Sequence, residues 1–348
     1  MKNLLTDIAG VRVGHADDAK LASGATAIVF DEPAVAAIDV RGGGPGTRED
    51  ALLDLANTVE RVDAIALSGG SAFGLEAGGG VQAWLAEQGR GFRIRDAVIP
   101  IVPGAIVFDL LNGGDKSWGR FPPYRDLGHE AAAAASPDFA IGSVGAGFGA
   151  TTANLKGGLG SASSVTPDGI KVGALAVVNA VGSVTVGDGP WFWAAPFEVD
   201  GEFGGLGLPP SFSPDMLTLR MKGGAAQGEN TTVAVVVTDA ALTKPQAKRL
   251  AMIAQTGMAR AIYPVHAPLD GDVVSSPPRP AKGRSIPLWA SLNSACLPPT
   301  RWHARSRAAF SAQPHYPSRA RCRHGRIVSV ERFQADCSIK TARLWLRR

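Results

Sequence analysis

Residues 228–239 read GENTTVAVVVTD, a polar turn followed by an uninterrupted apolar run. The run is short, rich in Val and bounded by Asp239, a pattern typical of a buried strand. Asn230, Thr231 and Thr232 stand where the turn enters this strand.

Similar apolar runs, bounded by glycine or aspartate, recur between residue 24 and about residue 270. They predict strands over 25–30, 62–70, 98–108, 139–150, 170–184 and 231–240. Apolar residues at three-to-four spacing predict helices over 49–59, 72–89 and 244–263, with Thr243 as N-cap of the last and Pro245 in its first turn. An α/β layered domain follows.

The composition is that of a soluble globular protein, because 348 residues with 45% hydrophobic content can bury a core. The first residues carry no apolar leader, and no stretch approaches the ~18 apolar residues that span a membrane. We therefore expect a cytoplasmic protein without membrane contact. The three cysteines all lie after residue 275, and the six histidines are scattered, so we expect no metal and no cofactor.

The segment 275–348 differs from the body before it. It holds 13 Arg and 2 Lys against Glu331 and Asp336, a local charge of +13, whereas the remaining residues carry −9. A basic tail that binds nucleic acid is one interpretation. The interpretation that we favour is a frameshift near codon 274. If one base is restored there and codons are chosen freely, the translated string has a balanced charge and a composition like that of the preceding residues. We then expect 275–348 to be an aberrant, poorly ordered tail that does not pack on the body.

Thr231 has the setting of a nucleophile in enzymes that cut their own backbone. Its hydroxyl can attack the preceding carbonyl, an N-to-O shift gives an ester, and water then cleaves the ester. The new α-amine, with an unperturbed pKa near ~8, can take the proton of the hydroxyl in later turnovers. Two threonines that open a strand also have a structural explanation, because β-branched residues favour strands.

A resemblance to a known family decides between these two explanations. The chain resembles the L-aminopeptidase/D-esterase and β-aminopeptidase family, the DmpA-like peptidases, and within this family it resembles the branch of 6-aminohexanoate-oligomer (nylon-oligomer) hydrolases most. The matching strings, in chain order from residue 3 to about 274, are NLLTDIAGVRVGHADD, RGGGPGTRE, ALSGGSAFGLEA, PIVPGAIVFDL, GSVGAGFGATTANLKGGLGSAS, VGALAVVNAVG, ENTTVAVVVTD and LDGDVV.

The resemblance implies an α+β fold, a four-layer αββα sandwich of the N-terminal-nucleophile type that ornithine acetyltransferases share. It implies one catalytic domain, cut between Asn230 and Thr231 into an α chain, 1–230, and a β chain that starts with 231–274. It further implies a homo-oligomer of αβ units that hydrolyses small peptides or other amides.

Four further matched residues receive roles from the same resemblance. Asn179 helps to hold the oxyanion, Lys156 orients the nucleophile region or stabilises charge, and Asp270 and Asp272 assist self-cleavage. Each residue also has a structural explanation: Asn179 could satisfy a turn, Lys156 could be a solvated loop residue, and DGD could be an ordinary turn.

The chain departs from the family pattern at two positions. Phe108 stands where some members have a Tyr hydroxyl near the site, which removes one donor from the pocket. Gly79 stands where an acidic residue is expected.

Three other functions have some support in the sequence. Gly145, Gly147 and Ala150 form G-x-G-x-x-A, but the glycines that follow disfavour the helix of a dinucleotide site and indicate a turn. Ser71 in LSGGSAFG is similar to a nucleophilic serine, yet it lacks the G-x-S-x-G spacing and is kept only as a pocket residue. An acyltransferase of the ornithine acetyltransferase type, or a non-catalytic frameshifted relic, remains the alternative to a hydrolase.

Overall fold

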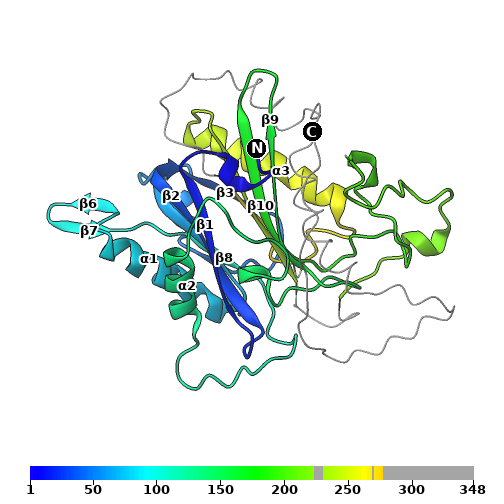
Figure 1. Ribbon diagram of the computed structural model, residues 1–348, viewed down its shortest axis with the longest axis horizontal. Helices are drawn as coiled ribbons and strands as arrows, with labels where there is room; N and C mark the ends of the chain where they lie inside the picture. Colours follow the sequence, from blue (N-terminus) through cyan, green and yellow to red (C-terminus); the bar gives the residue numbers. More distant parts are fainter. Residues whose placement is uncertain (199, 223–229, 269, 277–348) are drawn as a thin grey trace.

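Two five-stranded sheets form the centre of the protein (Figure 1). The computed structural model describes residues 1–198, 200–222, 230–268 and 270–276. The first sheet consists, from edge to edge, of β1 (Val11–Asp18), β2 (Ser23–Val35), β5 (Arg61–Ser68), β8 (Gly104–Ile106) and β4 (Thr47–Arg48). The second consists of β3 (Ala37–Val40), β12 (Val273–Ser276), β11 (Thr231–Thr238), β10 (Lys171–Asn179) and β9 (Gly158–Val165).

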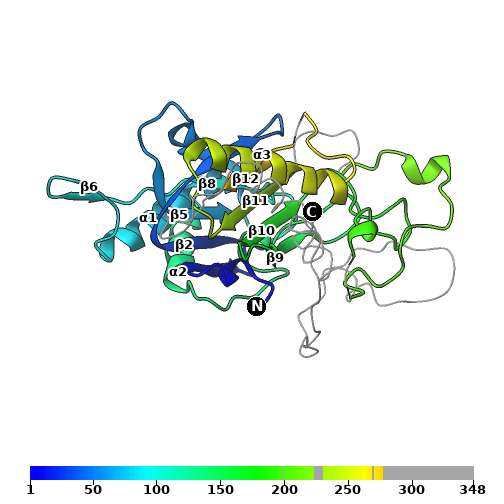
Figure 2. The same ribbon diagram turned by 90° about the horizontal axis from the view of Figure 1, so that it is seen from above.

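Helices cover the outer face of each sheet, as Figure 2 shows. Helices α1 (Ala77–Glu87) and α2 (Tyr124–Ala133) pack on the first sheet through one apolar cluster. Helix α3 (Lys244–Ala261) packs on the second through another, and a third cluster fills the space between the sheets. The expected αββα sandwich is therefore confirmed.

The central strand β11 is buried on both faces, which explains its unbroken apolar run. Val233, Val235 and Val237 belong to the cluster between the sheets. Ala234 and Val236 alternate with them and pack toward α3. A one-residue slip would exchange these two sets, so the apolar pattern fixes the register.

Two predicted elements are wrong, and buried polar contacts explain both. Residues 139–150 form no strand but lead to the 3-10 turn η4 (Gly145–Gly147), where Gly145 has φ +52° and the N–H of Ala146 donates to the Thr26 hydroxyl. Residues 49–59 form only the 3-10 turn η2 (Asp50–Leu53). There the buried ammonium of Lys244 donates to carbonyl oxygens of Leu52, Asn57 and Val59, and the Leu52 carbonyl is one that a continuous helix would have paired with the N–H of Ala56.

Several elements were not predicted. These are β1, β3, β4, β6 (Phe92–Ile94), β9, β12, α2, and the 3-10 turns η1 (Leu5–Asp7), η5 (Ala195–Phe197) and η6 (Pro214–Leu217). The single strand predicted over 98–108 is two strands, β7 (Ala97–Ile99), which pairs with β6, and β8 in the first sheet. The 3-10 turn η3 (Ser71–Glu76) leads into α1, which falls within the predicted helix 72–89.

The expected boundary at residue 274 falls inside β12. Ser275 and Ser276 continue that strand and pair with Ile38 and Ala37 of β3, so the body extends at least two residues further than expected. The expectations of a frameshift and of an unpacked tail otherwise concern residues outside the described ones. None of the helices in the described part of the chain has the length and apolar character needed to span a bilayer.

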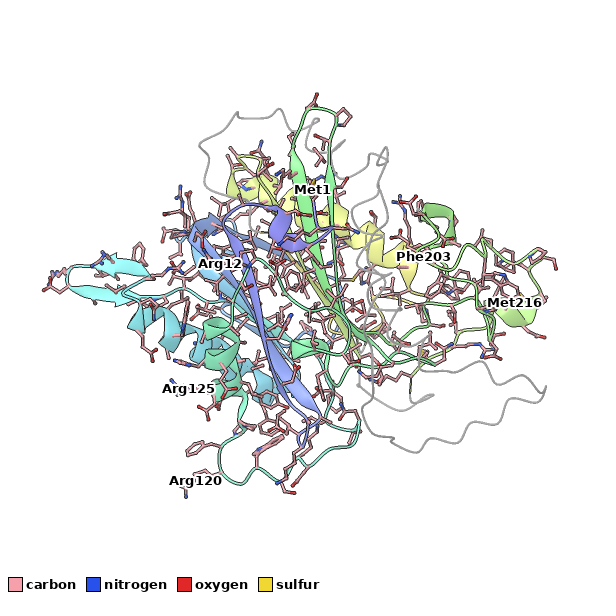
Figure 3. All side chains as sticks on the ribbon, viewed as in Figure 1. Met1, Arg12, Arg120, Arg125, Phe203 and Met216 are labelled. Atoms are coloured by element: carbon pink, nitrogen blue, oxygen red, sulfur yellow. The ribbon has the colours of Figure 1, made fainter. Side chains whose placement is uncertain are left out.

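A long excursion between β10 and β11 extends beyond the sandwich (Figure 3). Phe203 lies where the excursion meets the body and packs against Phe192, with ring centroids 5.6 Å apart, whereas Met216 lies farther out. The described part of the excursion ends at Lys222, whose backbone N–H donates to the Val181 carbonyl. The chain thus returns from the excursion to the end of β10.

The structure has room for an acidic side chain at position 79, where this sequence has a glycine. A Cβ at Gly79 would lie 3.7 Å from Arg125 Nε and 3.9 Å from one Arg48 guanidinium nitrogen. Arg48 Nε is buried without a hydrogen-bond partner among the described residues. We predict that Gly79→Asp raises the free energy of unfolding by about 1 kcal/mol, because it adds a carboxylate between two arginines and removes a glycine from a helix interior.

Thermal unfolding measures this effect. The matched control is Gly80→Ala in the same helix, where a Cβ would lie 1.8 Å from the Arg125 carbonyl oxygen, so this variant should lose stability. A lower melting temperature for Gly79→Asp would show that the arginines gain nothing from a carboxylate.

Candidate active site

Thr231 is the first residue of β11, and only 3% of its surface is exposed. Its hydroxyl Oγ1 donates a hydrogen bond to the carbonyl oxygen of Asn230 at 2.5 Å. The backbone N–H of Gly271 donates to the same oxygen at 3.2 Å. The carbonyl before Thr231 therefore has a hydroxyl beside it and a second donor that polarises it.

Glycines allow the loops around this carbonyl to approach each other. A Cβ at Gly271 would lie 2.7 Å from Thr231 Oγ1 and 3.0 Å from the Gly44 carbonyl oxygen. The Gly44 N–H donates to the carbonyl of Asp270 at 2.8 Å, and a Cβ at Gly42 would lie 2.1 Å from that same carbonyl oxygen. The glycines of RGGGPG and LDGDVV thus let two loops and a strand meet at backbone distance.

Asn179 lies directly opposite Thr231 in the antiparallel register of β10 and β11. Strand alternation turns both side chains toward the space between the sheets. The Asn179 amide donates through Nδ2 to the Phe108 carbonyl at 2.9 Å. Its Oδ1 accepts from the Thr151 N–H and from Lys222 Nζ, both at 3.0 Å. These contacts hold the amide in one orientation beside the candidate nucleophile.

Lys156 is held in the wall of the site by backbone carbonyls. Its Nζ donates to the carbonyl oxygens of Phe148 at 2.7 Å and Ala150 at 2.8 Å. Burial lowers the pKa of Lys156 to about 8, the charge of Asp109 opposes this change, and Lys222 adds to it. Lys156 is therefore not a solvated loop residue, and it contributes positive charge near Asn179.

The acidic turn after Pro268 holds two carboxyl groups in different settings. Asp272 Oδ1 accepts from the Thr232 N–H at 2.6 Å. Its Oδ2 accepts from the backbone N–H of His266 at 3.1 Å and from the ring Nδ1 of His266 at 2.8 Å. Asp270 is fully buried, and neither of its carboxyl oxygens has a hydrogen-bond partner among the described residues.

These settings separate the two carboxyl groups chemically. Burial, together with the nearby charge of Asp272, raises the pKa of Asp270 to about 8. Asp270 therefore carries a proton at neutral pH, beside the negative charge of Asp272. The backbone of Asp270 also forms an isolated parallel β-bridge with the backbone of Asn230, whose carbonyl oxygen accepts the hydrogen bond from the Thr231 hydroxyl. A neutral acid and a carboxylate next to a hydroxyl and a polarised carbonyl can perform acyl transfer.

The two predicted pocket residues lie at the end of the first sheet. Phe108 follows β8, and its carbonyl orients Asn179. Ser71 begins η3 with φ +51°, and its N–H donates to the Val107 carbonyl. Among the described residues, no hydrogen bond joins the Ser71 hydroxyl to a histidine or an aspartate, which disfavours the serine-hydrolase alternative.

The sequence analysis missed three residues near the site. His266 holds Asp272, and Lys222 holds Asn179. Asp109 accepts from the Ser23 hydroxyl at 2.6 Å and from the Gly70 N–H at 2.7 Å, and burial raises its pKa. Asp109 lies within the quoted string PIVPGAIVFDL, so that string was the available signal. His266 and Lys222 stand in segments without a motif or a period.

Metal ligation has no evident place in this arrangement. Within residues 1–198, 200–222, 230–268 and 270–276, no three His, Cys, Asp or Glu side chains are grouped so that they could hold a metal ion.

Comparison with known proteins supports the family resemblance. The sequence model of peptidase family S58 matches residues 3–279. An uncharacterised aminopeptidase of Mycobacterium tuberculosis is 45% identical over 281 residues, which cover 78% of this chain and 80% of that protein. A 6-aminohexanoate-oligomer endohydrolase of a Kocuria strain is 29% identical over 283 residues, covering 78% and 74% of the two chains. The oligomer hydrolase is thus a more distant relative than the aminopeptidase.

Solved structures support the fold. A β-aminopeptidase of a Burkholderia species superposes with a TM-score of 0.59 at 20% identity, covering 99% of this chain and 86% of that one. An L-aminopeptidase D-Ala-esterase/amidase of Ochrobactrum anthropi, described as a variant of the N-terminal-nucleophile hydrolase fold, superposes with a TM-score of 0.56 at 21% identity. It covers 82% of this chain and 77% of its own.

The raised pKa of Asp270 predicts a pH-dependent stability. A carboxyl that ionises near pH ~4 when unfolded, but near about pH 8 when folded, makes the folded state hold an extra proton between these values. Its stabilising effect is fully present below pH ~4 and is lost as pH rises toward 8, by at most about 1.4 kcal/mol per pH unit. Asp270→Asn should remove this slope.

Melting temperatures between pH 5 and pH 8 test the prediction. Both chains should carry Thr231→Ala, so that the hydroxyl beside the Asn230 carbonyl is absent and the chain stays intact. The exposed Asp168→Asn is the matched control and should leave the slope unchanged. Equal slopes with and without Asp270→Asn would mean that Asp270 is already ionised at pH 5.

Proposed function

The chain belongs to peptidase family S58, and from this we propose that it is a self-processing hydrolase of amide bonds. It cleaves its own backbone between Asn230 and Thr231, and it then uses the freed Thr231 on small peptides, amino-acid amides or oligoamides. Family membership itself makes the chain a hydrolase, and its fold is of the N-terminal-nucleophile type. The observation that carries the proposal is the Thr231 hydroxyl at 2.5 Å from the Asn230 carbonyl oxygen.

Self-cleavage begins when Thr231 Oγ1 attacks the carbonyl carbon of Asn230. The hydroxyl gives up its proton to solvent water as negative charge develops on the carbonyl oxygen, where the Gly271 N–H stabilises it, and solvent later returns a proton to Asp270 in place of the one that it donates. Asp270, protonated at neutral pH, donates a proton to the departing amide nitrogen. The resulting ester joins Asn230 to Thr231 Oγ1, and water hydrolyses it to a carboxylate at Asn230 and a free α-amine at Thr231.

Turnover of external amides uses the same hydroxyl with a new base. The free α-amine, with an unperturbed pKa near ~8, takes the hydroxyl proton as Oγ1 attacks the substrate carbonyl. Departure of the substrate amine leaves an acyl ester on Thr231, and water releases the acid. Asn179, opposite Thr231 and held by Lys222 and Thr151, presents its amide to the developing oxyanion.

Relatives support the choice of substrate class. The 45% identity to a mycobacterial aminopeptidase favours peptides or amino-acid amides with a free amino end. The 29% identity to a 6-aminohexanoate-oligomer endohydrolase supports synthetic oligoamides as further substrates.

Replacing the nucleophile tests the proposal. We predict that wild-type chain gives two fragments on a denaturing gel and that the shorter one begins at Thr231 by N-terminal sequencing. Thr231→Ala should abolish both fragmentation and amide hydrolysis, because both reactions use the same hydroxyl. Thr231→Ser should retain both in part.

Thr232→Val is the matched control, because it keeps the shape of a threonine on the strand face that points toward α3. It should cleave like wild type. Fragmentation that persists in Thr231→Ala and stops in Thr232→Val would transfer the nucleophile to Thr232. A wild-type chain that folds but stays in one piece would refute self-processing.

A further inference from the structure

His266 contacts the acidic turn at a place that the proposed chemistry does not use. Both its backbone N–H and its ring Nδ1 lie within hydrogen-bonding distance of Asp272 Oδ2, at 3.1 and 2.8 Å. The ring can donate through Nδ1 whether it is neutral or doubly protonated. Its side chain is 21% exposed, whereas the Asp272 side chain is fully buried. His266 is thus the solvent-facing partner of a buried carboxylate.

The three donors divide unequally between the two carboxyl groups of the turn. Asp272 receives all three, from Thr232 and twice from His266. Asp270, two residues away, receives none among the described residues. Burial and the negative charge of Asp272 both raise the pKa of Asp270, so the proton of the pair lies on Asp270.

Few other charged groups lie close enough to change how the proton is shared between Asp270 and Asp272. Lys222 lowers the pKa of Asp270, which opposes the effects of burial and of Asp272. From the neighbouring loop, the Arg41 backbone N–H donates to the Asp272 carbonyl, but the Arg41 guanidinium pairs with Asp39 at 2.6 Å. From β11, the contact is the N–H of Thr232, which is uncharged. His266 is therefore the titratable side chain that contacts the Asp272 carboxylate directly.

We propose that His266 is a positioning residue that holds the Asp272 carboxylate beside Asp270 and thereby keeps the proton of the pair on Asp270, next to the Asn230–Thr231 bond. The inference rests on the proposed self-cleavage and adds a residue that controls it. Without the ring donor, only backbone N–H groups hold the Asp272 carboxylate, and the arrangement with its charge beside a neutral Asp270 becomes less populated. Self-cleavage then slows, and its loss at alkaline pH, where Asp270 gives up its proton, begins at a lower pH.

Two substitutions separate the ring from the backbone. His266 has φ +57°, which Gly and Asn adopt at little cost. His266→Gly therefore keeps the backbone and removes the ring, whereas His266→Asn keeps the backbone and restores an N–H donor near the Nδ1 position. His129→Asn is the matched control, because it removes a histidine–carboxylate pair, His129 Nε2 to Glu87 at 3.0 Å, on the outer surface.

The measurement is the rate of self-cleavage of the full chain, made by cell-free translation and followed on denaturing gels between pH 5 and pH 9. Relative to wild type, His266→Gly should be slower by roughly tenfold at neutral pH, less than the ~10²-fold or more that loss of an acid–base group costs. Its alkaline-side decline should begin about one pH unit lower, because the Asp272 charge that raises the pKa of Asp270 is less firmly held. His266→Asn should restore the rate to within about threefold of wild type.

The outcomes separate this inference from the proposed function. A wild-type chain that never cleaves refutes the proposed function, whatever the His266 variants do. A cleaving wild type whose pH profile coincides with that of His266→Gly, or His266→Gly and His266→Asn equally impaired, overturns the role of His266. Melting temperatures of the same variants in the Thr231→Ala background show whether the chain still folds, and equal values with different pH profiles support positioning.

Discussion

The antiparallel register of β10 and β11 is the constraint on which the site depends. It sets Asn179 opposite Thr231, and the apolar alternation of both strands prevents any slip, since a shift by one residue would turn five buried side chains of β11 to the wrong layer. The packing of the core therefore also fixes the positions of the polar residues at the strand ends. A hydroxyl and an amide are thus held on one face by packing that lies entirely outside the site.

Three chain segments complete the site at the end of these strands. The glycine loop that contains Gly42 and Gly44 holds the acidic turn by backbone hydrogen bonds, and the turn holds the Asn230 carbonyl through the Gly271 N–H. Burying Asp270 without a partner among the described residues costs stability at neutral pH. A site that served folding alone would not keep that carboxyl group, which is why we regard the acidic turn as functional.

Runs such as that of β11 predicted a layered α/β domain, because a strand that is apolar on both faces must be covered on both. The four-layer αββα arrangement was implied by the family resemblance, since a three-layer fold would bury both faces as well. The two wrong elements are those in which a distant polar side chain forms hydrogen bonds with the backbone. Lys244 donates to the carbonyl oxygens of Leu52 and Val59, and the Thr26 hydroxyl accepts from the N–H of Ala146. Thr231, Asn179 and the acidic pair could be named from motifs. His266 could not, because its role depends on a turn that brings its ring to Asp272, and no spacing rule encodes that contact.

The contacts of the Asn230 carbonyl also indicate which donor would act during the proposed self-cleavage. Both the Thr231 hydroxyl and the Gly271 N–H now point to the Asn230 carbonyl oxygen. Attack on the carbonyl carbon requires the hydroxyl to give up its proton, so it can no longer donate to that oxygen when the charge develops. The backbone N–H of Gly271 keeps its hydrogen, and its hydrogen bond to the Asn230 oxygen strengthens as that oxygen becomes negative. Because a Cβ at Gly271 would lie 2.7 Å from Thr231 Oγ1, the same glycine would both leave room for the proposed nucleophile and stabilise the oxyanion.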